Sequence, residues 1–95
     1  MVGMTPEDRP RVRLYTRRWC GYCIAARRLL SGRGIEFEEI PIDGDPELRR
    51  SISRANGNWP TVPMIFIGEH FVGGYRELSR LRMNGELDTL LEGAA

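Results

Sequence analysis

The chain has 95 residues, of which 41% are hydrophobic and 28% are charged, and its net charge is +1. These values are typical of one small globular domain, and no apolar run approaches the roughly 20 residues of a membrane-spanning helix. The near-neutral charge and the lack of a nucleic-acid-binding motif also count against nucleic acid. We therefore expect a single domain whose partners include neither a membrane nor nucleic acid.

The first ten residues have no apolar core of the kind that a signal peptide needs. We predict that residues 1–10 form a flexible tail and that residues 11–95 form the domain. A cytoplasmic location follows as an expectation. In that compartment a cysteine pair is more often catalytic than structural.

The first three predicted elements form a strand, a helix and a strand. Residues 12–16 alternate apolar and polar side chains, which indicates a strand. A helix is expected from Gly21 to about Ser31, ended by Gly32 and Gly34. Residues 35–40 are expected to form a second, more exposed strand. Such a unit of about thirty residues predicts a right-handed crossover between parallel strands.

The second half of the chain predicts a helix followed by a hairpin. Asp45 is suited to be the N-cap, with Pro46 at the first helical position, of a helix that runs to about Ala55. The apolar run at residues 64–67 is typical of a buried central strand. Gly68 and Glu69 then form a two-residue turn into a strand at 70–72, which predicts an antiparallel pair.

Two more helices are expected after the hairpin. Gly73 and Gly74 lead into a helix at 75–83, and a short last helix covers 86–92. Without the short last helix, the predicted order is β-α-β-α-β-β-α. It indicates an α/β fold in which helices flank a four-stranded mixed sheet.

The chain has two cysteines, Cys20 and Cys23, at the junction of the first strand and first helix. A sulfur at a helix start lies near free backbone N–H groups and the positive end of the helix dipole, which favours the thiolate. The second cysteine lies about one turn later on the same face and can close a short disulfide. The pair therefore predicts a redox switch.

Two structural alternatives account less well for this pair. A disulfide that bridges so few residues restricts the unfolded chain little, because stabilisation grows with the length of the closed loop. A structural zinc site usually has four Cys or His ligands, whereas this chain offers two cysteines and His70. A C-x-x-C motif beside a βαβ unit is instead typical of redox proteins.

Charge is unevenly distributed around the cysteines. Residues 1–33 hold eight arginines and two acidic residues, a net of +6, whereas residues 34–95 hold six arginines and eleven acidic residues, a net of −5. Arg17 and Arg18 lie just before the motif. We expect this charge to favour the thiolate and to attract anionic substrates.

Three motifs occur in the order and at the spacing of the glutaredoxins. They are YTRRWCGYC at residues 15–23, TVPMIFI at residues 61–67, and Gly73–Gly74. Over about residues 11–92 the chain resembles this family. The resemblance implies the thioredoxin fold and a monomeric thiol–disulfide oxidoreductase that uses glutathione and acts on disulfide-containing or glutathionylated proteins.

The resemblance also implies roles for individual residues. Cys20 would be the nucleophile and the more shielded Cys23 the resolving thiol, and the Val62–Pro63 peptide bond would be cis. Arg17 would bind the glycyl carboxylate of glutathione. The implied glutathione-binding residues are Arg17, Tyr22, Thr61, Val62, Pro63, Gly74, Tyr75 and Arg76.

The chain departs from the family pattern at three places. Gly21 replaces the common proline of the motif, and Trp59 stands where a basic or polar residue often assists carboxylate binding. Tyr75–Arg76 replaces a small residue and an aspartate that holds the ammonium of the γ-glutamyl group. Glu77 is a candidate to stand in for that aspartate. Another low-molecular-weight thiol therefore stays open as the co-substrate.

Two further alternatives follow from the resemblance. Glutaredoxins without proline after the first cysteine sometimes hold a [2Fe–2S] cluster between two subunits. Cys20 and one glutathione thiol per subunit would then be the ligands, in a dimer. Alternatively, thioredoxin reductase would supply the electrons to the dithiol.

Overall fold

The computed structural model describes residues 10–92. Within them the predicted order of elements is confirmed: β1 (Val12–Thr16), α1 (Gly21–Gly32), β2 (Glu38–Pro41), α2 (Pro46–Ala55), β3 (Met64–Ile67), β4 (His70–Gly73), α3 (Tyr75–Asn84) and α4 (Glu86–Leu91). The tail predicted at residues 1–10 lies outside the described residues except for Pro10. No helix in the described part of the chain has the length and apolar character needed to cross a membrane.

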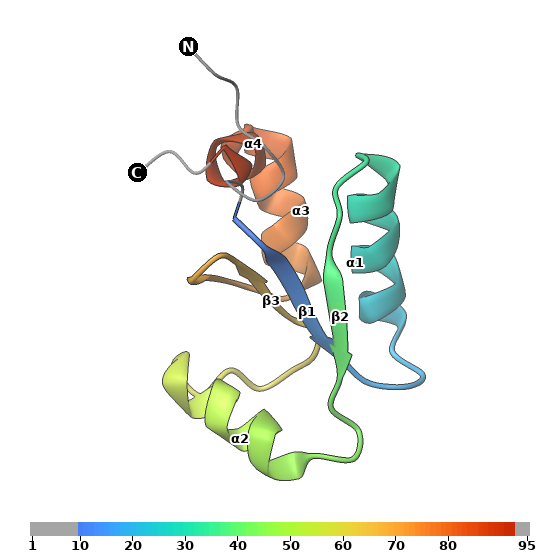
Figure 1. The fold of residues 1–95 in the computed structure, drawn as a ribbon, viewed down its shortest axis with the longest axis vertical. Helices are drawn as coiled ribbons and strands as arrows, with labels where there is room; N and C mark the ends of the chain where they lie inside the picture. Colours follow the sequence, from blue (N-terminus) through green and yellow to red (C-terminus); the bar gives the residue numbers. More distant parts are fainter. Residues whose placement is uncertain (1–9, 93–95) are drawn as a thin grey trace.

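The four strands form one mixed sheet in the order β2-β1-β3-β4 (Figure 1). β1 is parallel to β2, as the strand–helix–strand pattern predicts, and antiparallel to β3. β3 and β4 form the predicted antiparallel hairpin. The apolar β3 therefore lies inside the sheet, between β1 and β4.

Successive side chains on β1 and β3 point to opposite faces of the sheet, and the two faces carry separate cores. On one face, α1 and α3 lie side by side over the strands (Figure 1). The buried residues of this core are Val12, Leu14, Ala26, Leu30, Ile65, Ile67, Leu78 and Leu87. Burial of each leucine or isoleucine contributes about 1.5–3 kcal/mol, so this core contributes strongly to the stability.

The other face is covered less completely. Its buried residues are Tyr15, Cys20, Cys23, Ile42, Val62 and Met64, with Phe66, Phe71 and Trp59 packed against them. α2 contributes the partly buried Leu48 and Ile52 and has no fully buried residue. The cysteine pair therefore belongs to the smaller core.

The boundary predicted for the second strand is wrong, because β2 covers Glu38–Pro41 and not residues 35–40. The N–H of Ile35 donates to the carbonyl of Leu30 over 2.9 Å, and Gly34 has a φ of 69°. These contacts turn the chain after α1. Residues 35–37 therefore bring it back to β1 before pairing begins.

Strand register places three chain segments at one edge of the sheet. Tyr15 near the end of β1 pairs with Met64 at the start of β3, and Gly73 at the end of β4 pairs with Ile65. The loop after β1, the loop before β3 and the start of α3 therefore meet at this edge. Cys20 begins the helix that leaves it.

Candidate active site

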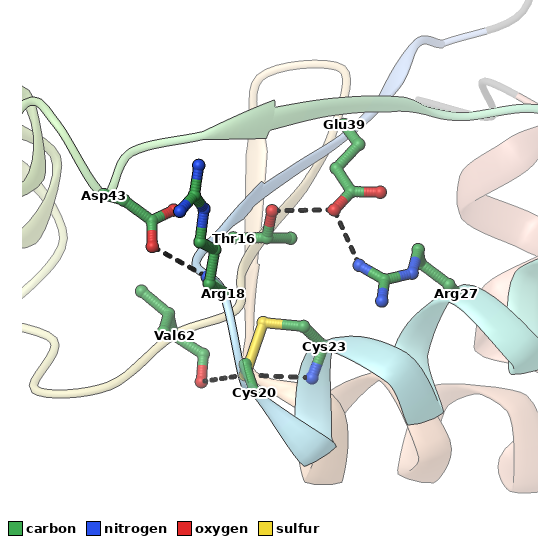
Figure 2. A network of polar contacts seen from close by, with 8 residues as sticks. All are labelled: Thr16, Arg18, Cys20, Cys23, Arg27, Glu39, Asp43 and Val62. Atoms are coloured by element: carbon green, nitrogen blue, oxygen red, sulfur yellow. Dashed lines mark hydrogen bonds and ion pairs between the residues drawn. A yellow bond between two sulfur atoms is a disulfide. The ribbon is translucent and has the colours of Figure 1, made fainter.

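Cys20 is the N-cap of α1, with φ −113° and ψ 105°, and its Sγ accepts a hydrogen bond from the N–H of Cys23 over 3.1 Å. The two cysteines form a disulfide, with their Cα atoms 5.2 Å apart (Figure 2). Cys20 is 5% exposed, whereas Cys23 is fully buried. The expected order of exposure is confirmed, but Cys20 itself is largely shielded.

The loop before β3 supplies the wall beside the sulfur. The Val62–Pro63 peptide bond is cis, which confirms the prediction, and the carbonyl oxygen of Val62 lies 3.7 Å from the Sγ of Cys20 (Figure 2). Val62 and Pro63 are buried and Thr61 is exposed. The main chain of this loop therefore faces the disulfide.

The start of α3 is built from two glycines and a glutamate. Gly74 is the N-cap, and its N–H donates to Oε1 of Glu77 over 2.9 Å. Gly73 has a φ of 114°, and a Cβ added there would lie 3.1 Å from the ring of Trp59. Only glycine suits this position, because both the backbone conformation and the available space exclude a side chain.

Glu77 and Trp59 stand at or next to positions that bind the ammonium and a carboxylate in related proteins. In this chain both side chains pack within the protein. One carboxylate oxygen of Glu77 caps α3. The ring of Trp59 packs edge-to-face on Phe71, with ring centres 5.3 Å apart, and its Nε1 is buried without a hydrogen bond in residues 10–92. Trp59 therefore fills the space beneath Gly73.

Tyr22 and Tyr75 connect the starts of α1 and α3. Their rings stack with centres 6.3 Å apart and an angle of 28° between the planes. The sequence predicts both as site residues but not this contact, which joins positions 53 apart in the chain. It brings the segment after Cys20 against the start of α3.

The guanidinium groups of the two arginines predicted to bind substrate form no hydrogen bond or ion pair with the other predicted site residues in the described chain. Arg17 is exposed, and its Nη1 donates to the carbonyl of Arg18 over 3.0 Å and to that of Trp19 over 3.5 Å. Arg76 is exposed and forms no ion pair within residues 10–92. Both guanidinium groups therefore remain accessible to a ligand.

Two polar connections hold the segments around the cysteines, and sequence reasoning missed both (Figure 2). Asp43 Oδ2 accepts a hydrogen bond from the backbone N–H of Arg18 over 2.8 Å. Glu39 Oε2 accepts from Thr16 Oγ1 over 2.8 Å and from Arg27 over 2.6 Å. Each joins residues at least 12 positions apart, so no local signal reveals them.

No cluster of three or more His, Cys, Asp or Glu side chains that could hold a metal is present in residues 10–92. The alternative of a cluster between two subunits needs only one cysteine from each chain together with glutathione thiols. It therefore stays a prediction.

Comparison with known proteins agrees with this architecture. The family model for glutaredoxin matches residues 12–72. The chain is 50% identical to a glutaredoxin of Pseudomonas aeruginosa over 82 residues, which span 86% of this chain and 96% of that protein. It is 42% identical to glutaredoxin 3 of Escherichia coli K12 over 81 residues, which span 85% of this chain and 96% of that protein.

Solved structures give the same result. The solution structure of a glutaredoxin from Brucella melitensis superposes with a TM-score of 0.81 at 41% identity, over 96% of this chain and 98% of that chain. The crystal structure of a buckwheat glutaredoxin–glutathione complex also gives a TM-score of 0.81, at 25% identity, over 90% of this chain and 81% of that chain. The fold is thus the thioredoxin fold. The chain belongs to the glutaredoxin family, and its Cys20–Cys23 pair is that of a thiol–disulfide oxidoreductase.

Proposed function

We propose that the protein uses glutathione to reduce protein disulfides and glutathione mixed disulfides through Cys20 and Cys23. The observation that carries the proposal is the position of Cys20 at the start of α1. Its sulfur receives the N–H of Cys23 and lies 3.7 Å from the carbonyl of Val62. A peptide-like thiol can pair with the main chain of that loop while its sulfur meets Cys20.

In the first step the thiolate of Cys20 attacks the glutathione sulfur of a glutathionylated protein. The existing S–S bond breaks, and the protein thiolate leaves and takes up a proton from solvent. Cys20 is then joined to glutathione. The Cys23 N–H, which is directed at the sulfur, stabilises the attacking thiolate.

The second step depends on the substrate. A second glutathione thiolate can attack the glutathione sulfur, which forms glutathione disulfide and releases the Cys20 thiolate. When Cys20 is instead joined to a protein, the Cys23 thiolate attacks the Cys20 sulfur, the Cys20–protein S–S bond breaks, and the protein thiolate leaves as the intramolecular disulfide forms. The 5.2 Å between their Cα atoms lies within the usual range for a disulfide. Two glutathiones then reduce it.

Main-chain groups would bind the backbone of glutathione. Thr61, Val62 and Pro63 form the loop beside the sulfur, and the peptide groups of Val62 are suited to pair with the cysteinyl part. The first N–H groups of α3, at Tyr75 and Arg76 after the N-cap Gly74, would bind the γ-glutamyl carboxylate.

Two side chains complete the proposed site. Arg17 is exposed beside the motif, and its guanidinium keeps donors free for the glycyl carboxylate. Tyr22, half exposed and stacked on Tyr75, would cover one side of the bound thiol. These assignments predict that the ligand lies from Arg17 across Cys20 to α3.

The charges at the start of α3 favour an alternative co-substrate in place of glutathione. Glu77, the candidate partner for the γ-glutamyl ammonium, already accepts the Gly74 N–H, and the exposed Arg76 adds positive charge nearby. An anionic low-molecular-weight thiol without an ammonium at this end would avoid that repulsion. Such a thiol is the alternative to glutathione.

The central test is reduction of β-hydroxyethyl disulfide by NADPH and glutathione reductase in the presence of glutathione. We expect turnover with the wild type. One matched reaction contains deaminated glutathione in place of glutathione. Another contains NADPH and thioredoxin reductase, with no glutathione. Turnover only in one of those reactions would reject glutathione and identify the corresponding alternative.

The cysteine roles are tested with single variants. Cys20→Ser should abolish turnover, whereas Cys23→Ser should keep it with glutathione and lose it on substrates that need dithiol reduction. An active Cys20→Ser beside an inactive Cys23→Ser would reverse the assignment. Absorption of anaerobically purified protein tests the cluster alternative, because a colourless monomer under those conditions contradicts it.

Cytoplasmic location also remains part of this proposal. A dithiol that must return to its reduced form after each cycle depends on a reducing compartment. Its protein partners would be disulfide-containing or glutathionylated proteins of that compartment.

A further inference from the structure

Exposed apolar side chains gather around the cysteine pair. Four large hydrophobic residues are exposed in the described part of the chain, and three belong to the motif region: Trp19 at 94%, Tyr22 at 57% and Ile24 at 40%. The fourth, Met83, lies near the far end of α3. An exposed tryptophan is unusual, because this residue is highly buried on average.

Trp19 and Ile24 occupy positions that often pair at a helix start, but both side chains are exposed. Trp19 precedes the N-cap Cys20, and Ile24 is the fourth residue of the helix. Apolar residues at these two positions commonly pack together and fix the chain entering a helix. Here both remain exposed, so the apolar surface of Trp19 is left to solvent.

The backbone holds Trp19 in this outward position. Its φ is 56°, a conformation that non-glycine residues rarely adopt. Among the other non-glycine residues of 10–92 only Asn58 shares it, and asparagine tolerates it well. The loop is fastened by the Asp43–Arg18 hydrogen bond and by Arg17, which donates to the carbonyls of residues 18 and 19. No packing of the indole itself explains the conformation.

Two arginines directly precede Trp19 in the chain. Arg17 and Arg18 are exposed, and neither guanidinium forms an ion pair with the rest of residues 10–92. Tryptophan and arginine are the residue types that most often contribute strongly to protein–protein binding. In the chain, the exposed tryptophan follows two arginines and precedes the reactive cysteine, an order that fits a segment with an apolar side chain and carboxylates.

We propose that Trp19 and Arg18 form a docking surface for the protein part of the substrate, beside the Arg17 that binds the glutathione part. The occupant of this surface is a segment that carries acidic residues and an apolar side chain next to the cysteine in the disulfide. Trp19 acts as a specificity-determining residue and takes no part in thiol exchange. This inference rests on the proposed function, because it selects substrates for the same reaction.

The test compares two synthetic peptides that each carry one glutathionylated cysteine. One has aspartate and leucine residues beside the cysteine, and the other has lysine in place of every aspartate. We expect the wild type to remove glutathione from the acidic peptide with a kcat/KM about tenfold higher than from the lysine peptide. Added salt should reduce this preference, since exposed charges are screened.

Variants of Trp19 test whether the preference for the acidic peptide comes from the docking surface. Trp19→Asn suits the left-handed backbone and removes the ring, so it should lower kcat/KM for the acidic peptide about tenfold. Its activity on β-hydroxyethyl disulfide should stay unchanged. Trp19→Phe should restore most of the loss, and Met83→Asn, the matched exposed control, should change neither substrate.

Each remaining result counts against the inference. Equal losses on peptide and small disulfide would mean that Trp19 acts on the dithiol, and no loss on the peptide would mean that nothing docks there. Binding of the two peptides to Cys20→Ser, measured by fluorescence anisotropy, separates docking from catalysis. A wild type that binds the acidic peptide preferentially but does not turn over the small disulfide contradicts the proposed function and not the surface.

Discussion

The carboxylate of Asp43 accepts a hydrogen bond from the backbone N–H of Arg18 over 2.8 Å and fastens the loop after β2 to the loop that leads to Cys20 (Figure 2). The N–H of Ile42 also donates to the carbonyl of Thr16 over 2.8 Å, so the two loops are joined twice. The position of Cys20 thus depends on a segment more than twenty residues away.

Replacement of Asp43 tests this connection. Asp43→Ala should lower the free energy of unfolding by about 1 kcal/mol, because an accepted hydrogen bond is lost at an exposed site. It should also slow β-hydroxyethyl disulfide reduction, since the cysteine loop is less well held. Asp43→Asn keeps an acceptor oxygen and should lie close to the wild type. Urea unfolding and the reductase-coupled assay measure both effects, and wild-type values for Asp43→Ala would show that the contact is dispensable.

Gly73→Ala should destabilise the protein by about 1–3 kcal/mol. The new methyl group would lie 3.1 Å from the Trp59 ring, and the φ of 114° disfavours any side chain. Gly32→Ala is the matched control, because its Cβ would meet nothing within 4 Å and no positive φ is involved. Thermal and urea unfolding should separate the two variants. Equal stabilities would argue against the close packing of Trp59 under the glycine.

Arg76→Asp should improve the use of glutathione. An acidic side chain at the second residue of α3 interacts favourably with the helix dipole and offers a carboxylate to the γ-glutamyl ammonium. We expect KM for glutathione to fall several-fold while kcat changes little. Arg80→Asp, an exposed position on the same helix, controls for net charge. A KM that falls equally in both variants would assign the effect to charge alone.

The thiolate of Cys20 should form at a lower pH than that of a free cysteine. The Cys23 N–H and the start of α1 both favour the negative sulfur. In reduced Cys23→Ser protein, alkylation by iodoacetamide should reach half of its maximal rate below about pH 8.5, the midpoint of a free thiol. A midpoint at or above that value would contradict the role assigned to the helix start.

Much of the fold was predictable from residues close together in the chain. Asp45 accepts the Leu48 N–H as the expected N-cap, and the alternation of β1 matches its two buried faces. The short Gly68–Glu69 turn correctly predicted the hairpin. Such features are local, because caps, turns and strand periodicity depend on neighbours within about one turn or one strand.

The start of β2 was not predictable in this way. Residues 35–37 alternate as a strand would, but Ile35 is drawn into the turn that ends α1. Ile35 and Phe37 then pack against the first core before the chain reaches β1. A tertiary contact here overrides a local pattern.

The candidate site likewise has some features that depend on nearby residues and others that depend on tertiary contacts. Local order in the chain placed Cys20 at a helix start and Cys23 one turn later, which is sufficient for a redox pair. The stacking of Tyr22 on Tyr75, the Trp59 ring beneath Gly73 and the Asp43–Arg18 bond appear only in the folded chain. Each joins segments that sheet register brings to one edge, and that register depends on burying both faces of β1 and β3 at once.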